Sequence, residues 1–597
     1  MRVLLVNPPL TPGGAVQPPV GLAALGAWLH SEGHSVQILD LDLEQRLAGK
    51  VQWPYACTCL DARMREFAPD VCGFTSMFSN SLFAARLIAR AKAWNDGVVT
   101  VAGGSHFGAL ATDSLAYIPE LDFAVRGEGE TAFADLLQAL DGRKDLAQVS
   151  GVARRERGTV LESKPGDLLN LAELPSPWNA ELFELHRYVS TDAGDRVAYL
   201  EVGRGCPFAC TFCATAPFWR RKYRVKTEYQ VVDELSALVD AGYERFIFVH
   251  DLLTVDRSYV KRLCEAIRES RLPVQWMANS RTDLSLEGLL PTMKLAGCWK
   301  LFFGIESAST RVQNSTTKRL DPMEATVAIV DLVAHGMTAT CSFVIGFPDE
   351  ARSEASESVR LAARMKLLGA EIVQFHRLRI WPPAPLSLLD VPHSFDSLSL
   401  DIEHPYLAAT LEERAEIEAC PKFYPGYFSP DSTLGSPSEV SQLEMFAHHA
   451  VGLAPLTIFM AETMCPGVIL DSVFKGAANR ELQRDQFDWD GGRMDKTWAA
   501  LTPILEAIVA AVAEEKPADA RVLREVLGYE RHRLQFTTDP SSRSMEFGCA
   551  VNIPLLLDQI RSGSALCLER LLQAIEVKLQ RSDTGTLSAY WAATASV

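Results

Sequence analysis

The chain has 597 residues, of which 48% are apolar and 22% charged, a composition typical of globular proteins that excludes a disordered or collagen-like chain. At about 150 residues per domain, the length predicts about three or four domains. The formal net charge of −17 argues against a protein that coats nucleic acid or binds anionic membranes.

The compartment can be inferred from what the chain does not contain. No apolar run reaches the ~20 residues of a membrane span, and the apolar stretch at the start is too short for a signal peptide. We therefore expect a cytoplasmic protein without a membrane span. In that reducing compartment, the 13 cysteines are expected as thiols, ligands or nucleophiles rather than as disulfides.

Residues 1–150 alternate short apolar segments with helical patterns. The segments expected as strands are 3–7, 35–42, 70–76, 98–104 and 122–130. This alternation predicts an α/β domain, a doubly wound parallel sheet with helices on both faces. Such a sheet binds its ligand beyond the carboxyl ends of its strands.

The alternation resumes after a segment, 151–194, that we expect to be a linker. Residues 195–390 contain six further strand-then-helix repeats, which predict a partial (β/α)6 barrel, smaller than the eight-fold form. The strands are expected at 196–203, 245–251, 274–280, 299–307, 338–346 and 371–380. Residues 391–597 are predicted to form a mostly helical domain that shapes substrate choice.

Cys206, Cys210 and Cys213 form a C-x3-C-x2-C motif directly after the first barrel strand. Three thiolates cannot complete a tetrahedral zinc site or hold all four irons of a [4Fe–4S] cluster. They would hold three irons and leave the fourth open to a small chelating molecule. We predict that these three cysteines are the metal ligands and are essential for catalysis.

The motif GRGCPFACTFC, including Phe212, resembles the radical S-adenosylmethionine (SAM) superfamily, and the resemblance extends across the predicted barrel. It implies a [4Fe–4S] cluster whose open iron is chelated by SAM. It also implies SAM contacts by Glu306 and Ser307 in GIES, by Arg281, and by Gly346 and Pro348 in GFPDE. For Glu306 and Arg281 the alternative is a buried salt bridge in the barrel.

Residues 1–140 resemble the cobalamin-binding domain that precedes the barrel in one radical SAM class. Small residues at strand ends carry this resemblance, because they let backbone approach a large flat ligand. The residues expected to contact cobalamin are Asn7, Pro8, Pro9, Gly21, Thr75, Ser76, Met77, Phe78, Gly103, Gly104, His106, Gly127, Glu128, Gly129 and Glu130. A dinucleotide site is the competing interpretation, but Gly-x-Gly-x-x-Gly is absent after the first strand.

The Asp-x-His-x-x-Gly motif that places a histidine on cobalt in other cobalamin domains is also absent. We expect the loop of residues 75–80 to face the lower side of cobalt without a strong ligand. His106 is the nearest candidate ligand, and we expect it to hold the periphery of the cofactor or the sheet edge instead.

Two smaller signals lie near the cysteine motif. The segment 217–227, PFWRRKYRVKT, contains five basic residues and is expected to shield the cluster or orient an acidic substrate rather than bind nucleic acid. His250 and Asp251 end the second barrel strand and are candidates for proton transfer or for a structural hydrogen-bonded pair.

The two resemblances together imply a cobalamin-dependent radical SAM methyltransferase, which moves a methyl group from SAM through methylcobalamin to a carbon atom. We expect a small-molecule or peptide-derived substrate, typically in natural-product biosynthesis, and an external one-electron reductant of the flavodoxin or ferredoxin type. The alternatives are a cobalamin-dependent oxidase or ring-contracting enzyme, a tetrapyrrole cyclase, and a non-catalytic cobalamin or SAM sensor. No nucleic acid is expected as a partner.

Overall fold

The computed structural model describes residues 1–9, 16–50, 52–179, 181–182, 184–189, 196–389, 391–395, 411–477, 494–539, 541–573, 575–582 and 587–593. The chain divides into two compact units. Unit 1 comprises Met1–Ser280, Leu286–Lys300 and Arg379–Ser429, and unit 2 comprises Arg281–Ser285, Leu301–Leu378 and Pro430–Val597.

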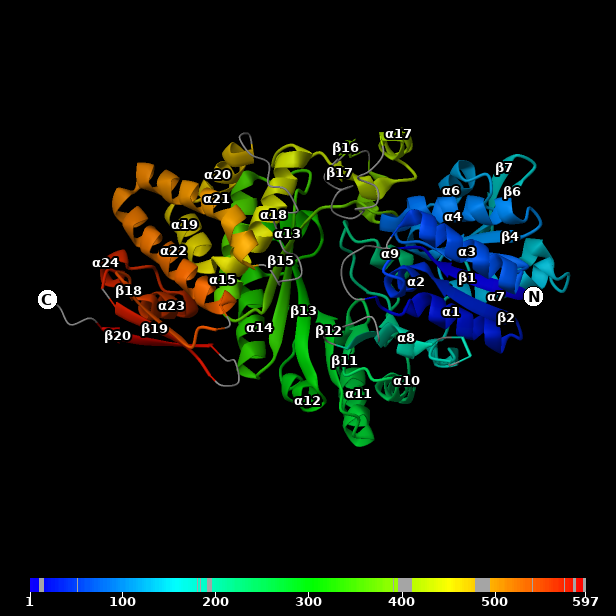
Figure 1. Cartoon of the computed structure of the whole chain (residues 1–597), viewed down its shortest axis with the longest axis horizontal. Coiled ribbons are helices and arrows are strands. Elements are labelled where there is room, and N and C mark those ends of the chain that lie inside the picture. Colours follow the sequence, from blue (N-terminus) through cyan, green and yellow to red (C-terminus); the bar gives the residue numbers. More distant parts are fainter. Residues whose placement is uncertain are drawn as a thin grey trace. The chain divides into compact units, whose positions relative to one another are not determined.

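The first sheet, in unit 1, has seven strands in the order β2-β1-β3-β4-β5-β6-β7 (Figure 1). They are β1 (Arg2–Asn7), β2 (Ser35–Asp40), β3 (Val71–Thr75), β4 (Val99–Gly103), β5 (Phe123–Val125), β6 (Val152–Glu156) and β7 (Thr159–Glu162). The helices between them are α1 (Val20–Ser31), α2 (Leu41–Leu47), α3 (Trp53–Phe67), α4 (Ser81–Trp94), α5 (Gly104–Ala109), α6 (Ala111–Tyr117) and α7 (Gly129–Leu140).

Strand β1, which has neighbours on both sides, shows why an interior strand of this sheet is an uninterrupted apolar run. Leu4 and Val6 pack into an apolar cluster with α3, α4 and α6, whereas Val3 and Leu5 pack into a second cluster with α1 and α7. Alternate side chains of a strand point to opposite faces, so helices on both faces require apolar residues at every position. Strands β1 to β5 pair in parallel, as the sequence predicted.

The segment predicted as a linker, residues 151–194, instead supplies the last two strands of this sheet. β6 pairs antiparallel with β5, and β7 pairs antiparallel with β6. Exposed charged side chains lie at both ends of this hairpin, Glu156 at its turn and Glu162 at its open end. Because β7 is the edge strand and is largely exposed, it lacks the apolar run by which the buried strands were found.

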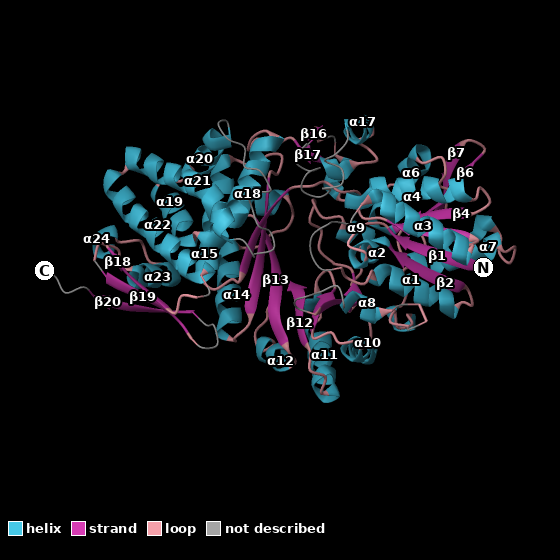
Figure 2. Ribbon diagram, in the orientation of Figure 1, coloured by secondary structure: helices cyan, strands magenta, loops and turns pink. Residues whose placement is uncertain are grey.

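The second sheet has six strands in the order β15-β14-β13-β12-β11-β8 (Figure 2). They are β8 (Val197–Glu201), β11 (Arg245–Val249), β12 (Gln275–Ser280), β13 (Cys298–Glu306), β14 (Thr338–Ile345) and β15 (Ile372–Arg377). Two short strands, β9 (Gly203–Arg204) and β10 (Arg224–Val225), pair antiparallel after β8. The helices are α8 (Leu185–Val189), α9 (Thr215–Phe218), α10 (Glu228–Asp240), α11 (Arg257–Ser270), α12 (Leu290–Leu295), α13 (Thr310–Ser315), α14 (Pro322–Ala334) and α15 (Arg352–Leu367).

The C-terminal region is helical with a small sheet added. Its helices are α17 (Leu411–Ala419), α18 (Pro437–Leu453), α19 (Pro455–Met464), α20 (Val468–Ala477), α21 (Met494–Glu515), α22 (Pro517–Thr538), α23 (Ile553–Ser562) and α24 (Leu568–Leu571). Strands β18 (Ser544–Cys549), β19 (Ile575–Arg581) and β20 (Leu587–Ala593) form an antiparallel sheet, and β16 (His393–Phe395) pairs with β17 (Phe428–Pro430). The antiparallel sheet was not predicted, but the α/β fold class of the chain is confirmed.

Helix α21 is the one described helix that is long and apolar enough to cross a membrane, and the bent pair α18–α19 passes the same test only if taken as a single span. Within unit 2, α21 packs against α20 and α22. Core helices of globular proteins have the same length and composition, so this feature alone does not indicate a membrane protein.

Candidate functional site

A cavity of about 330 Å³ opens at the carboxyl ends of the parallel strands in unit 1. Eight residues predicted to contact cobalamin line it: Gly21, Thr75, Gly103, Gly104, Gly127, Glu128, Gly129 and Glu130. Gly73 lies deeper, and a Cβ there would meet side chains of Leu5 and Phe133 at 2.9 Å. Five of the eight residues, and Gly73, are glycines, and the absence of side chains at these positions leaves the backbone open to a large ligand.

Gly104 is the most constrained of these glycines. Its φ is +89°, and a Cβ atom would lie 2.7 Å from the carbonyl oxygen of Ser76. It begins α5 directly after β4, where His106 N–H donates to that same carbonyl at 3.2 Å. The end of β4 therefore lies against the end of β3 at a separation that only glycine permits.

A buried network of charged side chains closes one side of the cavity. Arg204 donates to Glu128 at 2.7 Å, to Glu130 at 2.7 Å and to Glu201 at 2.8 Å, and Arg224 donates to Glu128 at 2.9 Å. Burial alone would lower the pKa of Arg204, but Glu130 and Glu201 raise it well above its usual value. Glu128 and Glu130 thus bind arginines from the segment around the cysteine motif.

The segment around the cysteine motif supplies four cavity residues that were not predicted to lie in the cobalamin site: Glu201, Arg204, Phe218 and Trp219. Trp219 faces two cations, with its ring centroid 5.7 Å from the Arg204 guanidinium and 5.6 Å from that of Arg224. The signal for them was present in the sequence, because Arg204 belongs to the GRGC motif and Phe218–Trp219 follow it. The partners Glu128 and Glu130, however, precede Arg204 by 76 and 74 residues.

The loop of residues 75–80 exposes the apolar side chain of Met77. Ser76 and Asn80 are buried and hydrogen-bonded to each other at 3.0 Å, and Asn80 also accepts from Met77 N–H at 3.0 Å. Met77 is 53% exposed, while Phe78 is buried and stacked on Trp381 at 5.5 Å. Serine, methionine and phenylalanine fit the expectation of a loop without a strong cobalt ligand.

His106 does not line the cavity. Its ring is fully buried between Phe78, Phe107 and Phe423, with centroids 4.8–5.2 Å away. Neither ring nitrogen has a hydrogen-bond partner among the described residues, and burial lowers the pKa of His106 to about 3. The side chain is therefore a neutral member of an aromatic cluster, and its expected cofactor contact stays a prediction.

Three more predicted residues lie outside the cavity. Asn7 donates to Asp40 at 2.9 Å, and Asp40 also accepts from Tyr188. Pro8 and Pro9 are buried next to it. The end of β1 thus serves internal packing in this structure.

The cysteine loop, also in unit 1, keeps its three thiols near one another. Burial raises the pKa of Cys206 to about 11, and the neighbouring Cys213 and Cys210 add to the shift. Asp251 accepts from the N–H of Gly205 at 2.7 Å, which fixes the start of the loop, and Phe212 is half-buried within it. Asp251, proposed for proton transfer, is thus already engaged by backbone.

This donor set fits an iron–sulfur cluster. No three His, Cys, Asp or Glu side chains among the described residues converge on a single metal ion. In a [4Fe–4S] cluster each cysteine binds a different iron, so the three thiols need not converge on one point. Mutual repulsion of the thiolates is what bound iron would neutralise.

The residues predicted to contact SAM through polar side chains lie in unit 2 and have protein partners. Glu306 accepts from Lys318 at 3.1 Å, and both side chains are largely buried. Arg281 binds both oxygens of Asp283, at 2.8 and 2.9 Å, and donates to the carbonyl of Lys318. Both therefore form the salt bridges of the alternative interpretation.

Glu306 also has an unusual backbone, with a φ of +68°. A non-glycine residue in the left-handed region is held there at a cost and is often found at functional sites. Gln313 donates to the carbonyl groups of Ile305 and Ser307, on both sides of Glu306. Ser307 itself is buried and accepts from the N–H of Ser309.

The GFPDE loop is held by a buried carboxyl group. Glu350 accepts from the N–H groups of Gly346 at 2.7 Å and of Phe347 at 3.3 Å, and burial raises its pKa to about 8. The carbonyl of Pro348 accepts from Thr433 N–H at 3.0 Å. The loop thus has a defined backbone shape, as an adenine-binding loop would require.

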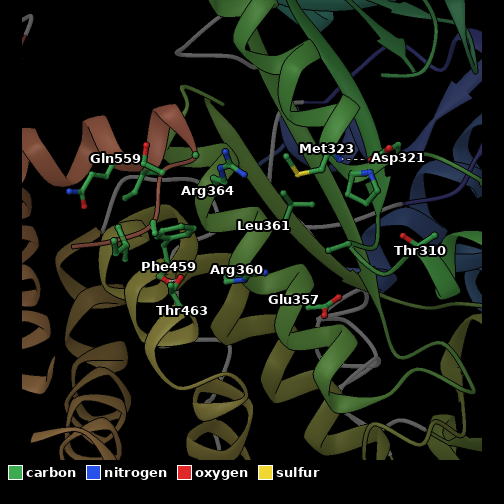
Figure 3. Close-up of a pocket in the computed structure, with 17 residues that line it drawn as sticks. Thr310, Asp321, Met323, Glu357, Arg360, Leu361, Arg364, Phe459, Thr463 and Gln559 are labelled. Carbon is green, nitrogen blue, oxygen red and sulfur yellow. Dashed lines mark hydrogen bonds between the residues drawn. The ribbon is translucent and has the colours of Figure 1, made fainter. Parts of the chain in front are cut away.

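A second cavity, of about 420 Å³, lies in unit 2 among α14, α15, α19 and α23 (Figure 3). Arg360 and Arg364, one turn apart on α15, line it together with Glu357 and Phe459. None of the residues predicted to bind cluster, SAM or cobalamin lines this cavity.

The chain matches two family models, the B12 binding domain over residues 10–137 and the radical SAM superfamily over residues 200–362. It is 31% identical to the uncharacterized methyltransferase PH0819 of Pyrococcus horikoshii, covering 62% of this chain and 79% of that protein. It is 32% identical to the cytidylyl-2-hydroxyethylphosphonate methyltransferase of Streptomyces wedmorensis, covering 58% and 73%. It is also 30% identical to the anaerobic magnesium-protoporphyrin IX monomethyl ester cyclase of Rubrivivax gelatinosus, covering 61% and 65%.

Solved structures share the fold. OxsB, a cobalamin-dependent SAM radical enzyme with aqua-cobalamin bound, aligns with a TM-score of 0.60 at 16% identity, covering 89% of this chain and 84% of that chain. The radical SAM methyltransferase TsrM from Kitasatospora setae, with tryptophan and a SAM analogue bound, aligns with a TM-score of 0.57 at 19% identity, covering 66% and 78%. With both domains and their order matched, this chain belongs to the cobalamin-dependent radical SAM enzymes and resembles the methyltransferases among them.

Proposed function

We propose that this methyltransferase transfers a methyl group from SAM, by way of cobalamin, to a carbon atom of a small-molecule or peptide-derived substrate. The observation that carries the proposal is the presence in unit 1 of both a glycine-lined cavity and a three-cysteine loop. The methyltransferase relatives support it, since they match this chain at 31% and 32% identity.

When bound, the cluster supplies an electron for cleaving SAM, and cobalamin supplies a carrier for the methyl group. Cys206, Cys210 and Cys213 would hold the cluster. The glycines of the cavity would admit cobalamin against the backbone. The protein's own contribution is to position the reactants and exclude water.

Glu306, Ser307, Arg281, Gly346 and Pro348 stay proposed SAM contacts. The buried Glu306–Lys318 pair gives a pre-formed charged group whose backbone is held in a rare conformation. The N–H of Gly346 already donates to Glu350. The GFPDE loop would therefore contact adenine through the shape of its backbone and not through a hydrogen bond from this N–H. For Arg281, a SAM carboxylate would have to share the guanidinium with Asp283.

A cytoplasmic location, a natural-product substrate and an external one-electron donor complete the proposal. The cyclase relative, at 30% identity, favours oxidative cyclisation of a tetrapyrrole as a second candidate. The two functions differ in product mass, because only methylation adds the mass of a methylene group.

The test begins with anaerobic purification, reconstitution with iron, sulfide and hydroxocobalamin, and metal analysis. About four irons and one cobalt per chain are expected. Candidate substrates are then incubated with SAM carrying a deuterated methyl group, and the label should appear in a carbon-methylated product. Iron without retained cobalt, or a product that never carries the label, would contradict the proposal.

A further inference from the structure

A basic turn follows the cysteine loop and is not used by the proposed chemistry. It consists of Arg220, Arg221 and Lys222, directly after α9 (Figure 1), and all three residues are exposed. Arg220 and Arg221 have φ angles of +51° and +56°. Two consecutive non-glycine residues in the left-handed region are costly, and glycine or asparagine would form the same turn at less cost. Arginine at both of these strained positions makes the two side chains candidates for a functional role.

The basic turn contacts the residues on both sides of Cys206. A Cβ at Gly205 would overlap the carbonyl oxygen of Lys222, so the two backbones touch. Arg221 donates to the carbonyl of Pro207 at 3.2 Å. Within the cysteine loop Ala209 is exposed, so the loop itself reaches the surface of unit 1. Charge placed on this turn is therefore at the surface and next to a predicted cluster ligand.

The positive charges of the turn are not neutralised by carboxylates among the described residues. Arg220 donates to the carbonyl of Gly166 at 2.5 Å, and no residue of the turn has a carboxylate partner among the described residues. The nearby Arg204 and Arg224 differ, because Glu128, Glu130 and Glu201 neutralise them. The turn therefore keeps its positive charge exposed, while the buried arginines do not.

We propose that this basic turn is the docking site for an acidic one-electron donor protein of the flavodoxin class. The inference rests on the proposed function, which requires one electron from outside the chain: the donor is oxidised by one electron and the cluster is reduced by one. With a net charge of −17, the chain as a whole repels an acidic protein. Productive encounter then needs a local cationic surface, and electron transfer needs that surface near the cluster.

The experiment uses the full chain reconstituted with its cluster, and compares wild type with the triple variant R220Q/R221Q/K222Q. A matched control, K261Q/R268Q/R271Q, removes three exposed charges from α11 and its C-terminal cap. Stopped-flow absorbance follows cluster reduction by reduced flavodoxin and, separately, photochemical reduction by a small deazaflavin. At low ionic strength the turn variant should be about tenfold slower or more with flavodoxin. Its rate should also depend less on salt.

Reduction by deazaflavin, iron content and the cluster spectrum should be unchanged in both variants, and the control should match wild type throughout. Equal loss with both reductants would overturn the inference in favour of a shielding or substrate-orienting role, and an unchanged flavodoxin rate would overturn it outright. Because the assay reads only cluster reduction, a failure of methyl transfer with normal flavodoxin dependence would refute the proposed function alone.

Discussion

The close approach at Gly104 makes a quantitative prediction for Gly104→Ala. A φ of +89° costs an L residue about 1–2 kcal/mol. The new Cβ would also lie 2.7 Å from Ser76 O and 2.8 Å from Thr75 Oγ1, and crowding of packed groups costs about 1–3 kcal/mol. The free energy of unfolding should therefore fall by about 2–5 kcal/mol.

Two glycines provide matched controls for the two causes. Gly33 has nearly the same φ, +87°, but a Cβ there meets nothing within 4 Å, so Gly33→Ala should cost only about 1–2 kcal/mol. Gly21 lines the cavity with an ordinary helical backbone, so Gly21→Ala should not destabilise the fold.

Urea unfolding followed by tryptophan fluorescence measures these differences, and hydroxocobalamin titration followed by visible absorbance measures the effect on the cofactor. Gly104→Ala should weaken cobalamin binding as well as stability, whereas Gly33→Ala should change stability only. If Gly104→Ala and Gly33→Ala cost the same, the backbone contact between the ends of β3 and β4 does not constrain position 104, and the reasoning fails.

Three further predictions concern other parts of the site. Replacing any of the three cluster cysteines by serine should reduce iron from about four per chain to near zero without changing hydroxocobalamin binding, which metal analysis and absorbance will check. Burial raises the pKa of Glu350 from 4.5 to about 8, so its contribution to stability is present at pH below 4.5 and is lost as the pH rises through 8. In Glu350→Gln the midpoint of thermal unfolding should therefore depend less on pH between 4.5 and 8. An unaltered pH profile would contradict the assignment. Arg204→Met leaves Glu130 and Glu201 without their cation, while Glu128 keeps Arg224, and should destabilise unit 1 by about 3–5 kcal/mol in denaturant unfolding, with Arg204→Lys less severe.

Sequence reasoning succeeded where one local pattern determined the structure. The buried parallel strands appear as apolar runs, since both of their faces are covered, and glycines at strand ends mark where backbone must approach a ligand. Gly103, Gly104 and Gly127 were chosen in this way and line one cavity, and their contact with a ligand stays a prediction.

Sequence reasoning was incomplete where the environment of a side chain depends on residues far away in the chain. The motif RGEGE was interpreted as backbone for a cofactor, but Glu128 and Glu130 are engaged by Arg204, 76 and 74 residues later. The burial of His106 depends on Phe423, which belongs to the C-terminal region of the chain. A pattern within a short stretch of sequence cannot identify partners that lie so far away in the chain. The polar hairpin β6–β7 was missed for a different reason, because it lacks the apolar run that would identify it.

The network around Arg204 also limits how this protein could have been assembled from parts. Glu128 and Glu130 lie within the segment matched to the B12 binding domain, whereas Glu201, Arg204 and Arg224 lie within the segment matched to the radical SAM superfamily. A hybrid that joins the first segment of one relative to the second segment of another would bury these carboxylates against residues that need not include the matching arginines. Exchange of the segment matched to the B12 binding domain, in evolution or in the laboratory, therefore has to carry the matching arginines with it.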